Sequence, residues 1–348
     1  MIKKLMLSLV ALLLALLGAE LLIRGSGAAP EMSIIHKGRF QLSANPRIGF
    51  EPVPRVDYAG HDLSFYDYQG SSNSLGYRDT EHAVAKPPGV YRVVVLGDSI
   101  AAGLKVERLE DTFPPILEGL LRQAGVDAEV INLSVSGYNT QQEVETLKDK
   151  GLRYRPDLVL VAYSLTDRER VDGDILKTLL EIKLHKEGTV AQPNSYLLDS
   201  ALYRFVRYRV LAAHQRPAVT EPALQAALDL ISGDTVAEYF GVLAGLAKES
   251  HFQVLIAVFP RLVRNFHAYR FIDQHQYVAA LSAQHGFQHL DLLDTMARCR
   301  EHSPEPIGAD NWHPAAAGHR CAAAAMAQAI LDAARPPCHC SLCANSRC

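Results

Sequence analysis

The sequence predicts an α/β fold in which a mainly parallel central sheet lies between two layers of helices. Two observations carry this prediction: short apolar runs typical of buried strands, and helical patterns between those runs. Strands separated by helices form right-handed βαβ units, which cover both faces of a parallel sheet. We therefore expect a three-layer α/β/α sandwich.

Five apolar runs are expected to form the strands of this sheet. They are residues 92–96, 129–133, 157–163, 253–259 and 287–290. Between them, apolar residues at helical spacing predict helices, among them 112–123 and 234–249. Asp234 is the expected N-cap of the second helix, because a carboxylate oxygen can accept from the first free N–H groups.

The first expected strand ends at Gly97-Asp98-Ser99, where a tight turn holds the Ser99 hydroxyl at the carboxyl end of a buried strand. A serine hydroxyl is a poor nucleophile alone, so catalysis requires a base and an oxyanion site elsewhere. Gly-Asp-Ser is also an ordinary turn sequence. By itself the motif leaves a catalytic and a structural interpretation open.

A base and an orienting carboxylate occur far downstream, where Asp310 stands three residues before His313. Pro314 suits the first position of the Ala-rich helix expected to follow, since its missing N–H is not needed there. Asp310 can hold one ring nitrogen of His313 while the other nitrogen faces a serine. Each residue alone is typical of a turn or an exposed histidine, but together with Ser99 they predict a Ser-His-Asp triad.

These motifs resemble the blocks of the GDSL/SGNH hydrolase family, which is named for its Ser, Gly, Asn and His. The resembling segments are residues 97–99, 132–140 and 310–314 with 318–319, flanked by 73–79 and 110–114. The resemblance covers about residues 72–331. It implies an SGNH-hydrolase-like, flavodoxin-like topology and an esterase or lipase.

The resemblance also implies an oxyanion hole made by the backbone N–H groups of Ser99 and Gly137 and by a block asparagine. Here Thr166 takes the place of that asparagine. Threonine keeps one O–H donor on a shorter, β-branched side chain. Because losing one oxyanion donor costs roughly 10²–10³ in turnover, we expect a slower or differently tuned enzyme. All three residues follow expected strands, at the edge where parallel sheets bind ligands.

Residues 1–24 are expected to be a signal anchor or a signal peptide. Two lysines precede the uncharged run 5–19, which Glu20 separates from a further apolar stretch, 21–23. Counting through Ile23 reaches the roughly 20 residues that a membrane span needs, whereas residues 26–28 offer a small-residue cleavage site. Both interpretations place the remaining chain outside the cytoplasm: anchored in the periplasm or at the cell surface, or secreted.

Four further segments are expected. Residues 25–68 form a linker and lead-in, 69–333 the hydrolase domain, 168–222 a possible cap insertion within it, and 334–348 a Cys-rich tail. An aromatic and basic stretch at 203–209 is either part of a cap that contacts substrate or membrane, or an ordinary amphipathic helix.

The six cysteines fall into two groups. Cys299 and Cys321 lie in the expected hydrolase domain and are either a disulfide or two buried thiols. The four cysteines of the tail lack a second, separated ligand pair, so disulfides or free thiols are expected there rather than a metal site.

Composition excludes several classes of function. The net charge is −3 with dispersed Lys and Arg, which gives no support to a nucleic-acid partner. The chain has neither a glycine-rich phosphate loop nor H-E-x-x-H, so no cofactor or metal is expected. The sequence therefore predicts an exported serine esterase acting on acyl-carbohydrate or lipid esters. The alternatives are an O-acyltransferase with the same triad, a weakened glycan-binding homologue and a structural envelope protein.

Overall fold

The computed structural model describes residues 2–29, 39–56, 70–168, 175–176, 179–180, 200–206, 210, 221–231 and 234–334. The chain divides into two compact units, one of residues 1–80 with 169–233 and one of residues 81–168 with 234–348. Most of the expected cap insertion and all but the first residue of the Cys-rich tail lie outside the described residues. The segment boundaries expected from the sequence stay a prediction.

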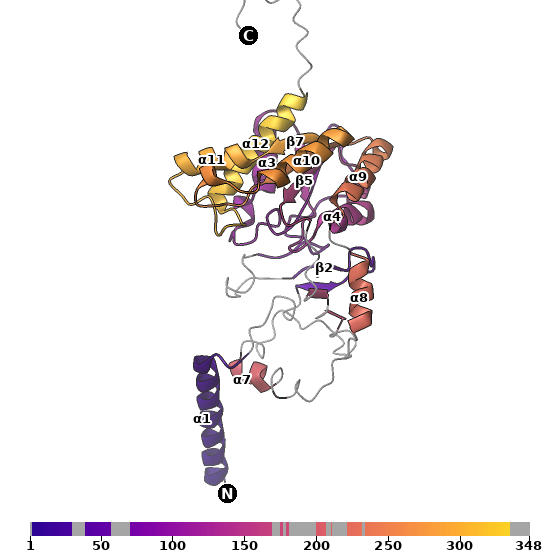
Figure 1. Ribbon diagram of the computed structural model, residues 1–348. Helices are drawn as coiled ribbons and strands as arrows, with labels where there is room; N and C mark the ends of the chain where they lie inside the picture. Colours follow the sequence, from indigo (N-terminus) through magenta and orange to yellow (C-terminus); the bar gives the residue numbers. More distant parts are fainter. Residues whose placement is uncertain are drawn as a thin grey trace, which may run out of the picture. The chain divides into compact units, whose positions relative to one another are not determined.

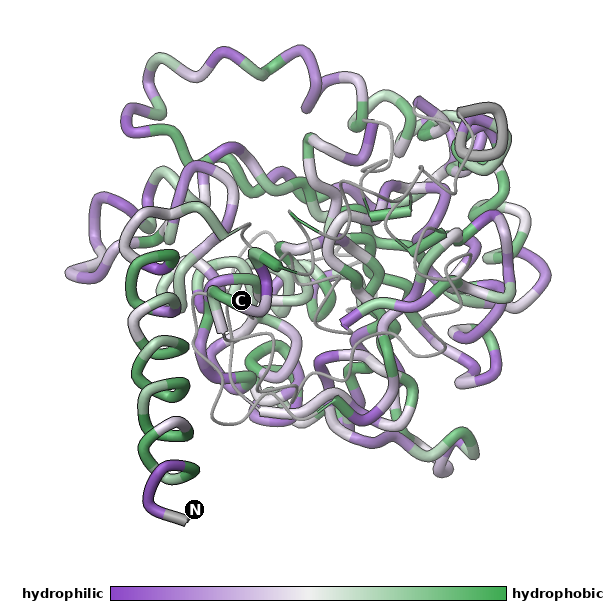
Figure 2. The backbone as a smooth tube through the Cα atoms, turned by 90° about the horizontal axis from the view of Figure 1, so that it is seen from below, coloured by the Kyte–Doolittle hydropathy of each residue, from purple (hydrophilic) through white to green (hydrophobic). Residues whose placement is uncertain are grey.

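The first unit contains a long apolar helix, α1 (Ile2–Ser26), which is long and apolar enough to cross a membrane. Figure 2 shows hydrophobic residues along most of its length. The unit also contains the antiparallel pair β1 (Phe40–Leu42) and β2 (Phe50–Pro52), and the helices α7 (Ala201–Arg204) and α8 (Glu221–Asp229). The strand pair lies in the expected lead-in, where three-residue strands are too short to show a periodic pattern.

Glu20, the acidic residue within the apolar N-terminal helix, has several partners. Its carboxylate accepts hydrogen bonds from Ser200 Oγ at 2.8 Å and from the backbone N–H groups of Ala201 at 2.9 Å and Leu202 at 2.8 Å. Arg24, one turn further along α1, forms an ion pair with it at 2.6 Å. The one acidic charge of α1 is thus balanced at the carboxyl-terminal end of the helix.

The second unit contains a five-stranded parallel sheet. Its strands are β3 (Tyr91–Gly97), β4 (Ala128–Asn132), β5 (Leu158–Ser164), β6 (Gln253–Phe259) and β7 (Gln288–Asp291), in the order β4-β3-β5-β6-β7. All five expected strands are confirmed, with ends shifted by at most one residue. Numbered within the sheet, the order is 2-1-3-4-5, the flavodoxin-like arrangement.

Helices cover both faces of this sheet (Figure 1). The helices α3 (Phe113–Gln123), α11 (Leu293–His302) and α12 (Ala316–Ala334) share a core with one face, in which Leu160 packs with Leu117 and Met326. On the other face lie α4 (Thr140–Thr146), α9 (Val236–Ser250) and α10 (Ile272–His285), and there Tyr163 meets Phe240 edge to face. Because successive side chains of a strand alternate between faces, the unbroken apolar run of β5 supplies both cores. The predicted three-layer α/β/α sandwich is confirmed.

Short helical turns complete the second unit. They are the 3₁₀ turns η1 (Leu109–Asp111), η3 (Leu152–Tyr154) and η6 (Phe266–Ala268), and the π-helical turn η2 (Leu147–Gly151).

Two helix starts differ from the sequence expectation. The N-cap of α9 is Thr235 rather than Asp234, whose carboxylate instead forms an ion pair with Arg168 at 2.6 Å. Helix α12 begins at Ala316 rather than at Pro314. The chain stays extended there because Pro314 lies in a β-bridge with Gly308, which keeps residues 313–315 out of the helix.

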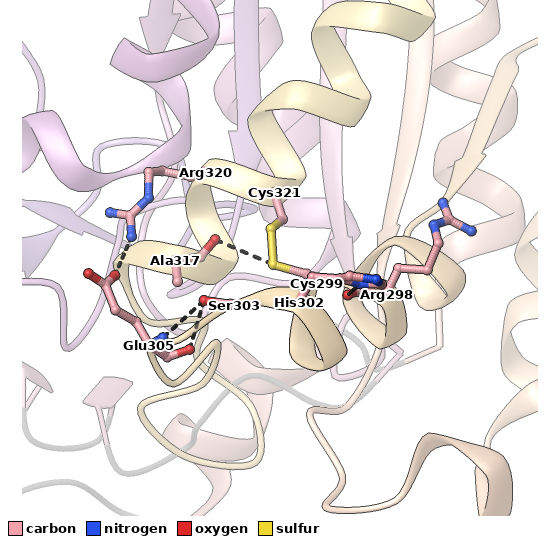
Figure 3. The surroundings of a disulfide bond; sticks show 8 residues. All are labelled: Arg298, Cys299, His302, Ser303, Glu305, Ala317, Arg320 and Cys321. Atoms are coloured by element: carbon pink, nitrogen blue, oxygen red, sulfur yellow. Dashed lines mark hydrogen bonds and ion pairs between the residues drawn. A yellow bond between two sulfur atoms is a disulfide. The ribbon is translucent and has the colours of Figure 1, made fainter.

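A disulfide joins Cys299 of α11 to Cys321 of α12, with the two Cα atoms 6.3 Å apart (Figure 3). The sequence allowed either a disulfide or two buried thiols for these cysteines, and the structure shows the disulfide. The bond closes a segment that carries both Asp310 and His313. Reducing the conformational freedom of that segment in the unfolded chain is the usual way in which a disulfide stabilises a fold.

We expect the double variant Cys299→Ala, Cys321→Ala to have a free energy of unfolding lower by about 3 kcal/mol, the size expected for closing a loop of this length. Urea denaturation measures it. Wild-type protein reduced with dithiothreitol is the control and should show the same loss. A free energy of unfolding unchanged in both samples would contradict a stabilising disulfide.

Candidate active site

Ser99 lies two residues beyond the end of β3, in a series of tight turns. Ala102 N–H donates to the carbonyl of Asp98 at 3.0 Å, and Leu104 N–H donates to the carbonyl of Ser99 at 2.9 Å. The turn needs glycine at position 97, because a Cβ there would lie 2.8 Å from that of Ala101. The chain can therefore turn sharply beside β5 and leave the Ser99 side chain partly exposed.

The structure brings Ser99, His313 and Asp310 together. Ser99 Oγ lies 3.0 Å from His313 Nε2, and His313 Nδ1 lies 2.8 Å from Asp310 Oδ2. Since an ionised carboxylate only accepts, Nδ1 carries the ring hydrogen and Nε2 accepts from the Ser99 hydroxyl. This is the hydrogen-bonded order that lets an imidazole take a proton from a serine.

The Asp310 carboxylate is strongly partnered. Its Oδ1 accepts from the backbone N–H groups of Trp312 and His313, both at 2.7 Å, and the Lys105 ammonium lies 2.9 Å from Oδ2. Burial by itself raises the pKa of this carboxyl group. The hydrogen bonds from His313, Lys105 and Trp312 outweigh burial and hold the pKa well below its usual value. Asp310 is therefore ionised when it faces the imidazole.

The loop that carries His313 is braced by the segment after β6. Leu262 N–H donates to the carbonyl of Asn311 at 2.8 Å, and the Arg261 guanidinium lies 3.3 Å from the centre of the Trp312 ring. Neither Arg261 nor Lys105 carries a motif, so sequence reasoning had no signal for them. Their contacts hold the histidine loop and its carboxylate in place.

Two backbone N–H groups, one in the serine turn and one in the loop after β4, are candidate donors to a ligand. Val135 N–H donates to the carbonyl of Gly97 at 3.1 Å, which holds the loop after β4 beside the serine turn. Gly137 in that loop has a φ of 85°, a conformation that favours glycine. Within the part of the chain that the structure describes, neither Ser99 N–H nor Gly137 N–H donates to a protein acceptor. Both donors remain available for a ligand oxygen.

Thr166, the third expected oxyanion donor, lies in the turn after β5. Its Oγ1 lies 2.7 Å from Ser164 Oγ and 3.3 Å from Asp98 Oδ2. These contacts place the hydroxyl next to the residue that precedes Ser99. The Thr166 hydroxyl therefore has hydrogen-bond partners within the protein, which the sequence did not predict.

Three buried carboxyl groups lie beneath the site and were not recognised as a group from the sequence. Asp98, Glu143 and Asp167 are each at most 5% exposed. Burial raises the pKa of all three, and their mutual repulsion adds to the rise for Glu143 and Asp167. The structure shows no metal-binding arrangement of three or more His, Cys, Asp or Glu among the residues it describes.

Known proteins that resemble this chain define its class and its family. The matching proteins are esterases and acylhydrolases, so the chain falls in the class of ester-bond hydrolases, here on an α/β/α sandwich. The model of the GDSL-like lipase/acylhydrolase family matches residues 95–321. The chain belongs to this family, and the resemblance stated from its motifs is confirmed.

Individual relatives are more distant. A segment of 76 residues is 36% identical to an arylesterase of Vibrio mimicus and covers 22% of this chain and 38% of that protein, well under half of its length. Among solved structures, TesA matches with 17% identity and a TM-score of 0.41 over 69% of this chain and 97% of its own. An acetylxylan esterase from Geobacillus stearothermophilus matches with 14% identity and a TM-score of 0.42 over 69% and 94%.

We expect Asp310→Asn to be less stable than the wild type at pH 7 by about 2 kcal/mol, because hydrogen bonds to a charged acceptor are lost. The folded-state pKa of Asp310 is lowered. Its stabilisation is therefore fully present above the unfolded value of about 3.9 and is lost as the pH falls through the folded value. Urea denaturation from about pH 7 to about pH 3 should show the difference shrinking. A difference independent of pH would contradict this assignment.

Proposed function

We propose that this chain is an exported serine esterase that hydrolyses carboxylic esters through Ser99, His313 and Asp310. One observation carries the proposal. A serine and a histidine 214 positions apart in the chain are within hydrogen-bond distance, and the same imidazole is held by an ionised carboxylate. Membership of the GDSL-like lipase/acylhydrolase family supports the ester substrate.

The reaction follows from the hydrogen-bonded order of the three residues. Ser99 Oγ attacks the acyl carbon while its proton passes to His313 Nε2, and Asp310 stabilises the imidazolium that forms. Collapse of the tetrahedral intermediate breaks the ester C–O bond, and His313 returns the proton to the departing alkoxide. Water then attacks the acyl-enzyme by the same steps in reverse and releases the acid.

The negative oxygen of the tetrahedral intermediate needs donors at the same edge of the sheet. We assign this role to the backbone N–H groups of Ser99 and Gly137 and to the Thr166 hydroxyl. The first two have no protein acceptor within the described ranges, which supports the assignment. Preorganised donors of this kind supply a large part of the rate enhancement in acyl transfer.

A fluorophosphonate probe should label Ser99 in the wild type and leave Ser99→Ala unlabelled. Hydrolysis of p-nitrophenyl esters should fall by about 10⁶ in kcat for Ser99→Ala, as is found when a serine nucleophile is removed. Ser303→Ala is the matched control: Ser303 caps the turn after α11 outside the site, donating to Glu305 O at 2.9 Å, and its loss should leave labelling intact.

The outcomes separate this proposal from its rivals. No labelling and no turnover above Ser99→Ala would refute the esterase and favour a glycan-binding protein. If Ser99 is labelled but product forms only when a sugar hydroxyl accepts the acyl group, the protein is an O-acyltransferase. Esters of increasing acyl length, set against acetylated oligosaccharides, distinguish lipid from carbohydrate substrates.

We further propose that the catalytic unit works outside the cytoplasm, attached by α1. The helix has the length of a membrane span, and its one acidic residue is balanced at the end far from the N-terminus. The disulfide between Cys299 and Cys321 suits an oxidising compartment.

Full-length protein should stay in the membrane fraction after an alkaline carbonate wash, whereas a variant that begins at residue 27 should be soluble. Intact mass then distinguishes an anchor from a cleaved signal. Retention of Lys3 and Lys4 in the exported protein supports the anchor, and loss of residues 1–26 or so would contradict it.

A further inference from the structure

A basic segment, residues 260–272, follows β6 beside the loop that carries His313. It contains three arginines and one histidine but no Asp or Glu, and these basic residues are Arg261, Arg264, His267 and Arg270. Because the segment begins directly after β6, it lies at the edge where the strands of the parallel sheet end and where such sheets bind ligands. The proposed reaction makes no use of this positive charge.

Within the basic segment, the Arg261 guanidinium contacts two aromatic rings. Its central carbon lies 3.3 Å from the centre of the Trp312 ring and 5.1 Å from that of Phe271. At 3.3 Å the guanidinium stacks on the face of the indole, because an approach in the plane of the ring would make atoms overlap. Stacking leaves the N–H donors free around the edge of the planar group. Since Trp312 immediately precedes His313, the stacked cation lies beside the proposed base.

The Arg261 guanidinium has no acceptor within the described part of the chain. It forms neither a hydrogen bond nor an ion pair there, although the side chain is only partly exposed. The carboxylate of the histidine loop, Asp310, is already paired with Lys105 at 2.9 Å. The nearby Asp291 is held by His275 at 2.9 Å. Arg261 therefore offers both its charge and its donors to a ligand.

A chain of hydrogen bonds from the protein interior holds the backbone of Arg261. Its N–H donates to Tyr269 Oη at 3.1 Å, and that hydroxyl lies 2.8 Å from Nε2 of the buried His275. Since the ionised Asp291 only accepts, His275 Nδ1 carries the ring hydrogen and Nε2 accepts from Tyr269. Burial raises the pKa of Tyr269 to about 12, so its hydroxyl keeps the hydrogen that it donates. A cation fixed in this way loses little conformational freedom when it binds an anion.

We propose that Arg261 binds a negatively charged group on the alcohol portion of the ester, so that the preferred substrates are esters of an anionic alcohol. This inference deepens the proposed function and rests on it. In the proposed reaction His313 returns its proton to the departing alkoxide, so the alcohol portion lies on the histidine side of the acyl carbon. The stacked guanidinium is carried on that side by Trp312, the neighbour of His313 in the same loop.

Carboxylate and phosphate groups both fit this cation. A guanidinium presents pairs of N–H donors that match two oxygens of either group, and such charge-assisted hydrogen bonds are stronger than neutral ones. Arg264 and Arg270, which form no ion pair with any described residue, add positive charge that attracts an anion to the same segment. Two kinds of alcohol supply the group: a sugar acid that bears an acyl ester, and a glycerophosphate that bears an acyl chain.

Two matched pairs of acetyl esters test the inference and distinguish these sources. One pair is the O-acetylated methyl glycoside of glucuronic acid and that of glucose, and the other is acetylglycerol phosphate and acetylglycerol. We expect kcat/KM for acetate release to be about tenfold higher for the anionic member of at least one pair, because hydrogen bonds to charged groups are the stronger ones. The pair that shows the preference identifies the source. Raising the salt from about 20 mM to about 500 mM should reduce the preference, because salt screens partly exposed charges.

Arg261→Gln removes the charge and should abolish the preference, measured as the ratio of kcat/KM for the anionic ester to that for its neutral analogue. The ratio separates anion binding from support of the histidine loop, because a displaced His313 would slow both members of a pair alike. Arg261→Lys keeps the charge without the planar donors and should retain part of the preference. Lys248→Gln, which removes an exposed charge from α9 on the other face of the sheet, is the matched control and should leave the ratio unchanged.

A wild type with equal kcat/KM for both members of both pairs would overturn the inference, and so would Arg261→Gln with an unchanged ratio. If Arg261→Gln fails to fold, the wild-type comparison and its salt dependence carry the test. Fluorophosphonate labelling distinguishes failure of this inference from failure of the proposed function. A wild type that is not labelled at Ser99 refutes the esterase, whereas labelled protein without a preference for anionic esters refutes only the role of Arg261.

Discussion

The parallel pairing of β3 with both β4 and β5 is the constraint on which the site depends. Its register sets Val95 opposite Asn132 and Gly97 opposite Ala162, so the three strands end side by side. The turns after these strands hold Ser99, Gly137 and Thr166. Since strand spacing is fixed at roughly 4.8 Å by backbone hydrogen bonds, the sheet positions the proposed nucleophile and the proposed oxyanion donors. Ligands bind at this switch point in open parallel sheets.

The histidine is placed by different means, because no strand of the sheet carries it. His313 lies in the loop between α11 and α12, and the disulfide joins these two helices. Within the loop, Asp310 accepts from the backbone of His313 and from its ring. The same carboxylate therefore shapes the turn and orients the imidazole, which ties the local fold to the chemistry.

The strands and the three triad residues could be predicted from the sequence. The features that could not be predicted all depend on tertiary contacts. Apolar runs give the strands, and short motifs give Ser99, Asp310 and His313, because these depend on neighbours in the chain. The partners Lys105 and Arg261 meet the histidine loop only through the fold, so no local pattern marks them. Glu143 and Asp167 resemble surface residues in the sequence, and their burial follows from packing alone. Pro314 was misjudged because its β-bridge to Gly308 is also a tertiary contact.

We propose that three adjacent strand ends form one oxyanion site around Ser99. A crystal structure of the fluorophosphonate adduct tests it directly, since the phosphoryl oxygen occupies the place of the oxyanion. We expect this oxygen to lie within about 3.1 Å of Ser99 N, Gly137 N and Thr166 Oγ1. A phosphoryl oxygen bound by other groups, with the Thr166 hydroxyl still donating to Asp98 Oδ2, would contradict this proposal.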